Sequence, residues 1–149
     1  VYNYITFYRQ VTGAPVLSMY NQSVAQLVMS AYPLHAWRVW KFRCAPRNWW
    51  KLLAIRFASG SNEEANAIVR LYMEDLAERL NINELRDWYN VTAEQLGSTD
   101  LLHLKILGKL PAVLKRIHPS HQWKLNLFTF NKKRSVEKRL QRQVDVLLP

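Results

Sequence analysis

One ten-residue segment occurs twice in this chain, and it constrains the fold more than any other feature. PLHAWRVWKF at residues 33–42, here called box 1, returns as PSHQWKLNLF at residues 119–128, called box 2. Both read P-x-H-x-W-x4-F, and they align without a gap at a shift of 86 residues. Neighbouring repeats share one core, so a structural unit built twice explains the pair better than a duplicated site.

The residues before each box have helical spacing. Asn21-Gln22 followed by Ser23 predicts a turn and a helix N-cap, and Gly108 stands in the corresponding turn before box 2. Pro33 and Pro119 then end the second helix, because proline lacks a donor and restricts the preceding residue. The apolar residues of the first stripe step by three and four: Leu17, Tyr20, Val24, Leu27, Val28 and Ala31.

Two further helices are expected in the middle of the chain. Pro46 is suited to the first turn of a helix whose apolar face holds Trp49, Trp50, Leu53 and Phe57. Ser61 or Asn62 then caps a long helix at about 62–80. Its inward residues are predicted to be Ala65, Ile68, Val69, Tyr72, Leu76 and Leu80. Thr92–Gln95 reads as a capping box that opens another short helix.

These patterns predict an all-α fold, since no segment alternates with period two. The expected architecture is two divergent helical repeats of about 86 residues, built from short helix-turn-helix pairs around a tryptophan-rich core. The predicted division is a first repeat unit at 1–87, a second, truncated unit at 88–130, and a basic C-terminal helix or tail at 131–149.

The motifs resemble those of a eukaryotic tandem-repeat family found in fungi, algae and protists. The shared boxes are D-W-Y-x-[VI]-[ST], here residues 87–92, and Y-P-x-H-x-W-x-x-W-x-F, here residues 32–42. A Leu-Leu-x-x-Tyr segment and a later Pro and Trp also correspond. The resemblance implies tandem units and no particular activity. The second predicted repeat departs from the family pattern at Ile106, His118 and Asn126, which suggests a degenerate end unit.

The net charge of +10 is distributed unevenly. Residues 1–60 carry seven Lys or Arg and no acid, residues 61–100 carry three basic and nine acidic side chains, and residues 101–149 carry eleven basic and two acidic ones. The three segments therefore have charges of +7, −6 and +9. Two basic arms around an acidic middle favour a polyanion as partner.

Metal chemistry is disfavoured by the residues available. His35 and His121 lack the cysteines or the second histidine at helical spacing that a zinc site needs. Each imidazole is expected to pack on the tryptophan of its own box and to bond a backbone carbonyl. Cys44 is the single cysteine, so it forms no internal disulfide and is expected to be a small apolar filler.

The sequence also predicts that the protein is not an enzyme and needs no cofactor or small-molecule substrate. Acidic residues gather in the middle of the chain, at Glu74, Asp75, Glu78, Glu84 and Asp87. Arg70, Arg79 and Arg86 are interleaved at salt-bridge spacing, so a solvated helix face is the expected role of these acids. No Gly-rich phosphate loop, nucleophile elbow or H-E-x-x-H motif occurs.

The leading hypothesis is a basic helical-repeat module that binds RNA or DNA through phosphate contacts, alone or within a nucleoprotein particle such as an organellar ribosome. The candidate binding residues are Arg38, Lys41, Arg43, Arg47, Lys51, Lys124, Lys132, Lys133, Arg134, Lys138, Arg139 and Arg142. Trp37, Trp40 and Trp123 have two interpretations, base-stacking platforms or core staples, and their fixed spacing favours the core. The alternative function is a protein–protein scaffold without nucleic-acid contact.

An intracellular location, in the mitochondrion or the nucleus, fits both hypotheses. No run of eighteen apolar residues occurs, which argues against a membrane span. The sequence begins at Val1, without a signal-type apolar segment. We therefore expect either a processed chain or a piece of a longer one.

Overall fold

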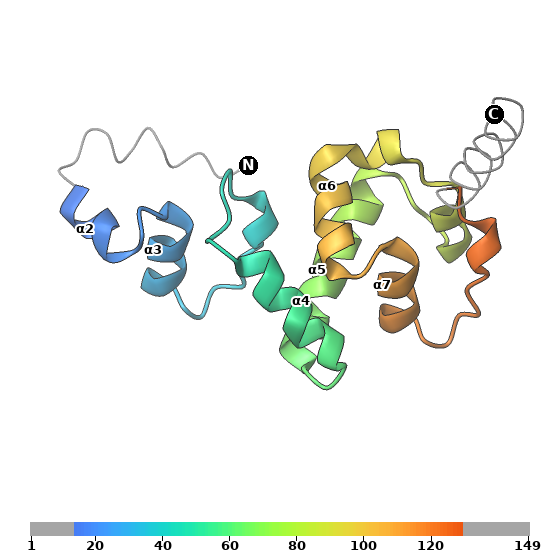
Figure 1. Cartoon of the computed structure of the whole chain (residues 1–149), viewed down its shortest axis with the longest axis horizontal. Helices are drawn as coiled ribbons and strands as arrows, with labels where there is room; N and C mark the ends of the chain where they lie inside the picture. The colour runs from blue at the N-terminus through green and yellow to red at the C-terminus, as the bar shows by residue number, and fades with distance from the viewer. Residues whose placement is uncertain (1–13, 130–149) are drawn as a thin grey trace, which may run out of the picture. The chain divides into compact units, whose positions relative to one another are not determined.

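The computed structural model describes residues 14–129, and the predictions for residues 1–13 and 130–149 lie outside this range. No strand occurs among the described residues, so the predicted all-α class is confirmed for them. The elements in chain order are the helices α2 (Ala14–Met19), α3 (Val24–Ala31), α4 (Trp49–Ser59), α5 (Glu63–Arg79), α6 (Ala93–Leu107) and α7 (Leu110–Ile117), with short 3₁₀ turns η1 (Val39–Lys41), η2 (Leu85–Asn90) and η3 (Leu125–Leu127) (Figure 1).

The chain forms two compact units, Val1–Leu52 and Leu53–Pro149, here called unit 1 and unit 2. The boundary falls within α4 and lies inside the first predicted repeat of residues 1–87. A compact unit and a sequence repeat are different divisions of a chain. The organisation into two repeats therefore remains a prediction.

Unit 1 is organised around box 1. Ala25 of α3, Val39 of η1 and Phe42 form a buried cluster. Four half-buried residues pack against this cluster: Met29, Trp37, Ala45 and Trp49. The cluster holds residues 42–49 close to α3. Phe42, at the start of this segment, belongs to the cluster, and Trp49, at its end, packs against it.

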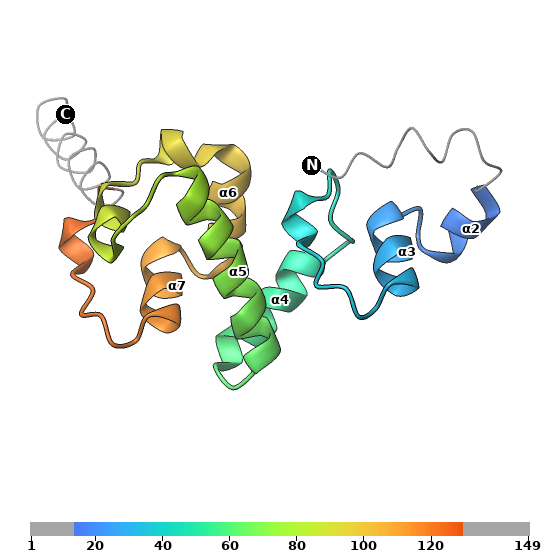
Figure 2. The same cartoon turned by 180° about the vertical axis from the view of Figure 1, so that it is seen from behind.

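Unit 2 has a larger core, and its helices α5, α6 and α7 pack together (Figures 1 and 2). Helix α6 bends at Gly97, whose φ of 72° and ψ of 169° are not helical. The buried apolar residues of this unit are Leu53, Phe57, Ala65, Val69, Tyr72, Met73, Leu76, Trp88, Val91, Leu96, Leu104, Leu107, Leu110, Val113, Leu114, Ile117 and Phe128.

The predicted helix starts are confirmed at three positions. The Gln26 backbone N–H donates to Ser23 Oγ at 3.2 Å, and the Ala65 N–H donates to Asn62 Oδ1 at 2.8 Å. Thr92 and Gln95 form a reciprocal capping box. Each cap satisfies amide groups that the first helical turn leaves without partners.

Two details of the predicted helices are wrong. Helix α4 begins at Trp49, three residues after Pro46, so Pro46 lies before the helix and not in its first turn. In α5, Ile68 and Leu80 are half-buried, whereas Met73 is buried. Met73 directly follows Tyr72 of the predicted stripe, so the buried face of α5 is wider than that stripe.

The two boxes have the same local structure. α3 and α7 end at residues that are 86 apart, as do η1 and η3. The cap residues Tyr32 and His118 have nearly identical backbone angles, with φ of −129° and −126° and ψ of 69° in both. This correspondence is local and concerns each segment by itself.

Candidate functional site

The candidate basic residues that the structure describes are concentrated in unit 1. Arg43, Arg47 and Lys51 are exposed, whereas Arg38 and Lys41 are half-buried around η1. Lys124 is exposed in unit 2. The other candidates lie outside the described residues, namely Lys132, Lys133, Arg134, Lys138, Arg139 and Arg142.

Unit 1 contains no acidic side chain at all. Its sequence has neither Asp nor Glu, and its basic residues are Arg9, Arg38, Lys41, Arg43, Arg47 and Lys51. No carboxylate of this unit can therefore neutralise its cations. A unit whose own charges are all positive attracts anions, because charges of one sign produce a potential that extends about a Debye length into the solvent.

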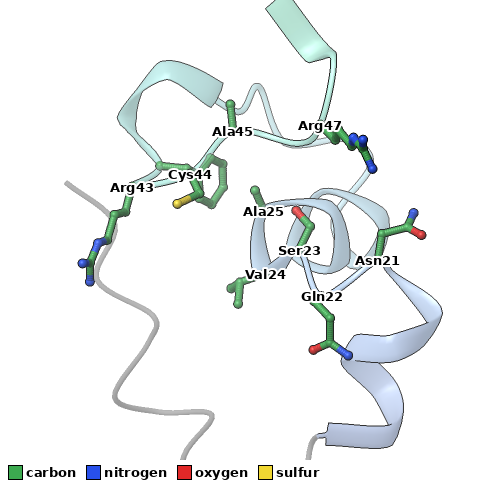
Figure 3. A pocket seen from close by; sticks show the side chains of 10 residues that line it. Asn21, Gln22, Ser23, Val24, Ala25, Arg43, Cys44, Ala45 and Arg47 are labelled. Atoms are coloured by element: carbon green, nitrogen blue, oxygen red, sulfur yellow. The ribbon is translucent and has the colours of Figure 1, made fainter. Parts of the chain in front are cut away.

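Two of these arginines line an open pocket of about 390 Å³ (Figure 3). One wall is the turn and first residues of α3, Asn21–Ala25, and the other is the segment Phe42–Arg47 after box 1. Figure 3 shows Arg43 and Arg47 on opposite sides of the view, with Cys44 and Ala45 between them. The sequence pointed to these arginines but not to the pocket, because its walls are about twenty residues apart.

The walls of this pocket are held by local structure. Asn21 and Gln22 adopt left-handed φ values of 53° and 58°, which turn the chain sharply into the Ser23 cap. On the other side Phe42, which belongs to the buried cluster, anchors the start of the 42–47 segment. The electropositive start of α3 adds to the positive potential of the two arginines.

The box histidines pack against tryptophans, as the sequence predicts. Ring centroids are 4.2 Å apart for His35 and Trp37 and 4.4 Å apart for His121 and Trp123, with edge-to-face angles of 62° and 63°. The backbone carbonyl is bonded by the indole, however. Trp37 Nε1 donates to the carbonyl of residue 32 at 3.1 Å, and Trp123 Nε1 donates to that of residue 118 at 3.3 Å.

All three tryptophans that the sequence singled out, Trp37, Trp40 and Trp123, are half-buried. Trp37 also packs on Phe42 with ring centroids 5.6 Å apart, and Trp123 packs on Phe128 at 5.9 Å. Aromatic pairs at such distances stabilise a core beyond the area that they bury. These contacts are those of the predicted core staples.

Within residues 14–129, no group of histidine, cysteine and acidic side chains is arranged to hold a metal ion. Of the acidic cluster, Asp87 has a clear structural role. Its carboxylate accepts hydrogen bonds from the Glu84 and Asn83 backbone N–H groups at 2.9 and 3.0 Å. These bonds hold the pKa of Asp87 below its usual value, because they stabilise the ionised form.

A buried polar cluster, which the sequence did not reveal, joins α5 to α6. The Tyr72 hydroxyl donates to Asp100 Oδ1 at 2.9 Å, and Arg79 forms an ion pair with the other oxygen of Asp100. Burial first, and then the Asp100 charge, raises the pKa of Tyr72. A tyrosine that keeps its proton is suited to a structural bond. The sequence signal was a lone acid, Asp100, inside an apolar stripe.

Unit 2 has a second pocket of about 400 Å³ beside α5, η2 and the end of α7. Its lining combines Trp88 and Ile117 with Arg70, Glu84 and His118. Desolvation, the Arg70 charge and the His121 charge all lower the pKa of His118. This pocket carries charges of both signs, so it lacks the single-sign potential of unit 1.

No protein-family model, curated protein or solved structure matches the chain. None of the helices in the described range has the length and hydropathy needed to cross a bilayer.

Proposed function

We propose that this protein binds RNA or DNA, mainly through contacts of its basic side chains with the phosphate backbone. The observation that carries the proposal is the charge of unit 1, which has six Lys or Arg and no acidic residue in its sequence. A role within a larger nucleoprotein particle of the mitochondrion or nucleus, such as an organellar ribosome, belongs to the same proposal.

The physical basis of such binding is the release of counterions. Each phosphate that a Lys or Arg neutralises releases condensed cations, so the affinity falls as salt rises. Arg43, Arg47 and Lys51 are exposed on one unit and four residues apart along the chain. Contacts of this type position a nucleic acid without reading its sequence.

A second candidate function is a protein–protein scaffold, and one observation in box 2 favours it. Val39 of box 1 is 2% exposed, but its counterpart Leu125 is 58% exposed, and Leu127 is also exposed. Leu125 and Leu127 are exposed apolar side chains two residues apart, and such side chains are available to a protein partner. The experiment described next distinguishes this function from nucleic-acid binding.

The experiment is a salt titration with the full chain and fluorescently labelled RNA and duplex DNA. We expect the affinity for RNA and duplex DNA to fall by several orders of magnitude when the salt concentration rises from about 50 mM to about 200 mM. The triple variant Arg43→Gln, Arg47→Gln and Lys51→Gln is expected to reduce the slope of log K against log[salt] by about 2–3, since each contact contributes about 0.7–0.9. Reversing the charges of Lys132, Lys133 and Arg134 measures the contribution of the C-terminal candidates.

A matched control removes the same charge elsewhere. Arg86, Lys105 and Lys115 are exposed in unit 2, so their triple replacement by Gln lowers the net charge equally. An equal loss of affinity in this control would show that only the total charge matters. Absence of RNA and DNA binding at low salt would exclude the proposal and leave the scaffold.

A further inference from the structure

The pocket of unit 1 has more than a basic rim. Its volume of about 390 Å³ lies within the range of about 300–1,000 Å³ that is typical of ligand sites. The apolar part of its lining is Val24, Ala25, Phe42, Cys44 and Ala45, and the polar part is Asn21, Gln22, Ser23, Arg43 and Arg47. A bare phosphate or a duplex backbone would contact the arginines but would leave the apolar surface of the pocket uncovered.

A ligand that fills this pocket must combine negative charge with an apolar group. A nucleotide in a single strand does, since its base has an apolar face and its phosphates precede and follow it along the strand. In a duplex the bases are stacked and paired, so they reach a protein pocket only after costly extrusion. The carboxamides of Asn21 and Gln22 carry the donors and acceptors that pair with the edge of a base.

We infer that this pocket takes an unpaired nucleobase of a single-stranded nucleic acid, with the neighbouring phosphates at Arg43 and Arg47. The inference rests on the proposed function and adds to it the substrate class and the position of the base. Figure 3 shows the two arginines on opposite sides of the apolar residues Cys44 and Ala45. A strand that crosses the pocket meets one cation before its base and one after it.

The backbone at Gln22 supports this assignment. Gln22 has a φ of 58°, a left-handed conformation that is unfavourable for a non-glycine residue. At the position 86 residues later stands Gly108, for which a positive φ carries no such cost. Unit 1 therefore has a long carboxamide at the position where the corresponding turn of unit 2 has glycine, and this carboxamide lines the pocket.

Cys44 provides a direct probe of the pocket. It is the single cysteine of the chain and belongs to the pocket lining. It is exposed, so the expectation that it is a small apolar filler is wrong. The rate at which N-ethylmaleimide alkylates the full chain therefore reports on this site alone. The rate is measured with oligo(U), oligo(dT) and an abasic oligomer of equal length, each held at about ten times its own Kd as determined by fluorescence anisotropy.

Base-containing oligomers are expected to slow the alkylation about elevenfold at this concentration, by simple mass action. The abasic oligomer controls for the electrostatic effect, because nearby phosphates alone raise a thiol pKa and reduce its reactivity. It is expected to slow the reaction by a clearly smaller factor. In the Gln22→Gly variant, affinity for oligo(U) should fall, while affinity for the abasic oligomer should stay unchanged.

Equal protection by the abasic oligomer would overturn the inference and leave the proposed function intact. So would oligomers that bind tightly but leave Cys44 fully reactive. If no oligomer binds at low salt, the proposed function itself fails. An acidic, leucine-containing peptide is tested in parallel, and stronger protection by this peptide than by oligo(U) would assign the pocket to a protein partner.

Discussion

Tyr72 of α5 and Asp100 of α6 form a buried hydrogen bond of 2.9 Å, although 28 residues separate them. Tyr72 is 2% exposed and Asp100 8%, so neither is freely solvated. Arg79 pairs with the same carboxylate and is itself half in solvent, with 58% of its side chain exposed. Asp100 is therefore held from two sides, by a hydrogen bond from Tyr72 and by an ion pair with Arg79.

The Tyr72→Phe variant should be less stable by about 1.5–3 kcal/mol, the usual contribution of a hydrogen bond to a charged group. The free energy of unfolding is measured by urea denaturation with circular dichroism. Glu78→Gln on the exposed side of α5 is the control and should change stability by less than about 0.5 kcal/mol. A Tyr72→Phe variant as stable as this control would mean that the bond contributes nothing.

Stability should fall more steeply above pH 10 in the wild-type protein than in Tyr72→Phe. The folded state raises the Tyr72 pKa above its ordinary value of 10.0, so only the unfolded state releases this proton just above that pH. The resulting loss approaches about 1.4 kcal/mol per pH unit. Urea denaturation at a series of pH values tests this, and below about pH 9 the two stability curves should run parallel.

The imidazole of His118 should titrate below its ordinary pKa of 6.5, since desolvation, Arg70 and His121 all disfavour its charged form. The folded state favours the neutral imidazole, so its contribution to stability is present above pH 6.5 and is lost as the pH falls through the lowered pKa of the folded state. Nuclear magnetic resonance should show a higher His118 midpoint in Arg70→Gln but not in the control Lys115→Gln. A wild-type midpoint above 6.5 would contradict the burial of this ring.

The indole N–H groups of Trp37 and Trp123 should each contribute about 0.5–1.5 kcal/mol through their bonds to backbone carbonyls. Benzothienylalanine keeps the bicyclic ring but lacks the N–H donor, so it isolates this term from packing. Incorporation at either position, followed by urea denaturation, measures the cost. A loss of stability at one position and a gain at the other would show that the two boxes are alike in geometry but not in energetics.

Two substitutions in corresponding turns should have opposite effects on stability. Gly108→Ala should destabilise by about 0.5–1 kcal/mol, because Gly108 has a φ of 115°. Gln22→Gly should stabilise by about 1 kcal/mol, because it relieves a left-handed non-glycine residue. Thermal denaturation compares both variants with the wild type, and a destabilised Gln22→Gly would show that the Gln22 side chain supports the fold.

Interactions between near neighbours in the sequence could be predicted. Ser23, Asn62 and Thr92 each accept a hydrogen bond from an amide three residues later. The geometry of a helix start brings these groups together whatever the rest of the chain does. For the same reason the helix ends before Pro33 and Pro119 were predictable, as were the charges of Arg43 and Arg47.

Other predictions failed where packing decided the outcome. Arg79 was expected to pair with an acid at helical spacing, but the structure pairs it with Asp100 on another helix, 21 residues away. Arg116, for which the sequence predicted no partner, has its guanidinium 4.9 Å from the Phe57 ring centroid, 59 residues away, and donates a hydrogen bond to the Phe57 carbonyl. No spacing rule connects such residues.

The sequence by itself determined the helical class, the helix caps, the paired boxes and the lack of acids in residues 1–60. These features depend on residue type and on neighbours within one or two helical turns. Only the tertiary structure decided that Asp100 is held by Tyr72 and Arg79, and that Asn21 and Arg47 line one pocket. Such relationships arise when distant segments bury their apolar faces together, and that packing is a property of the whole chain.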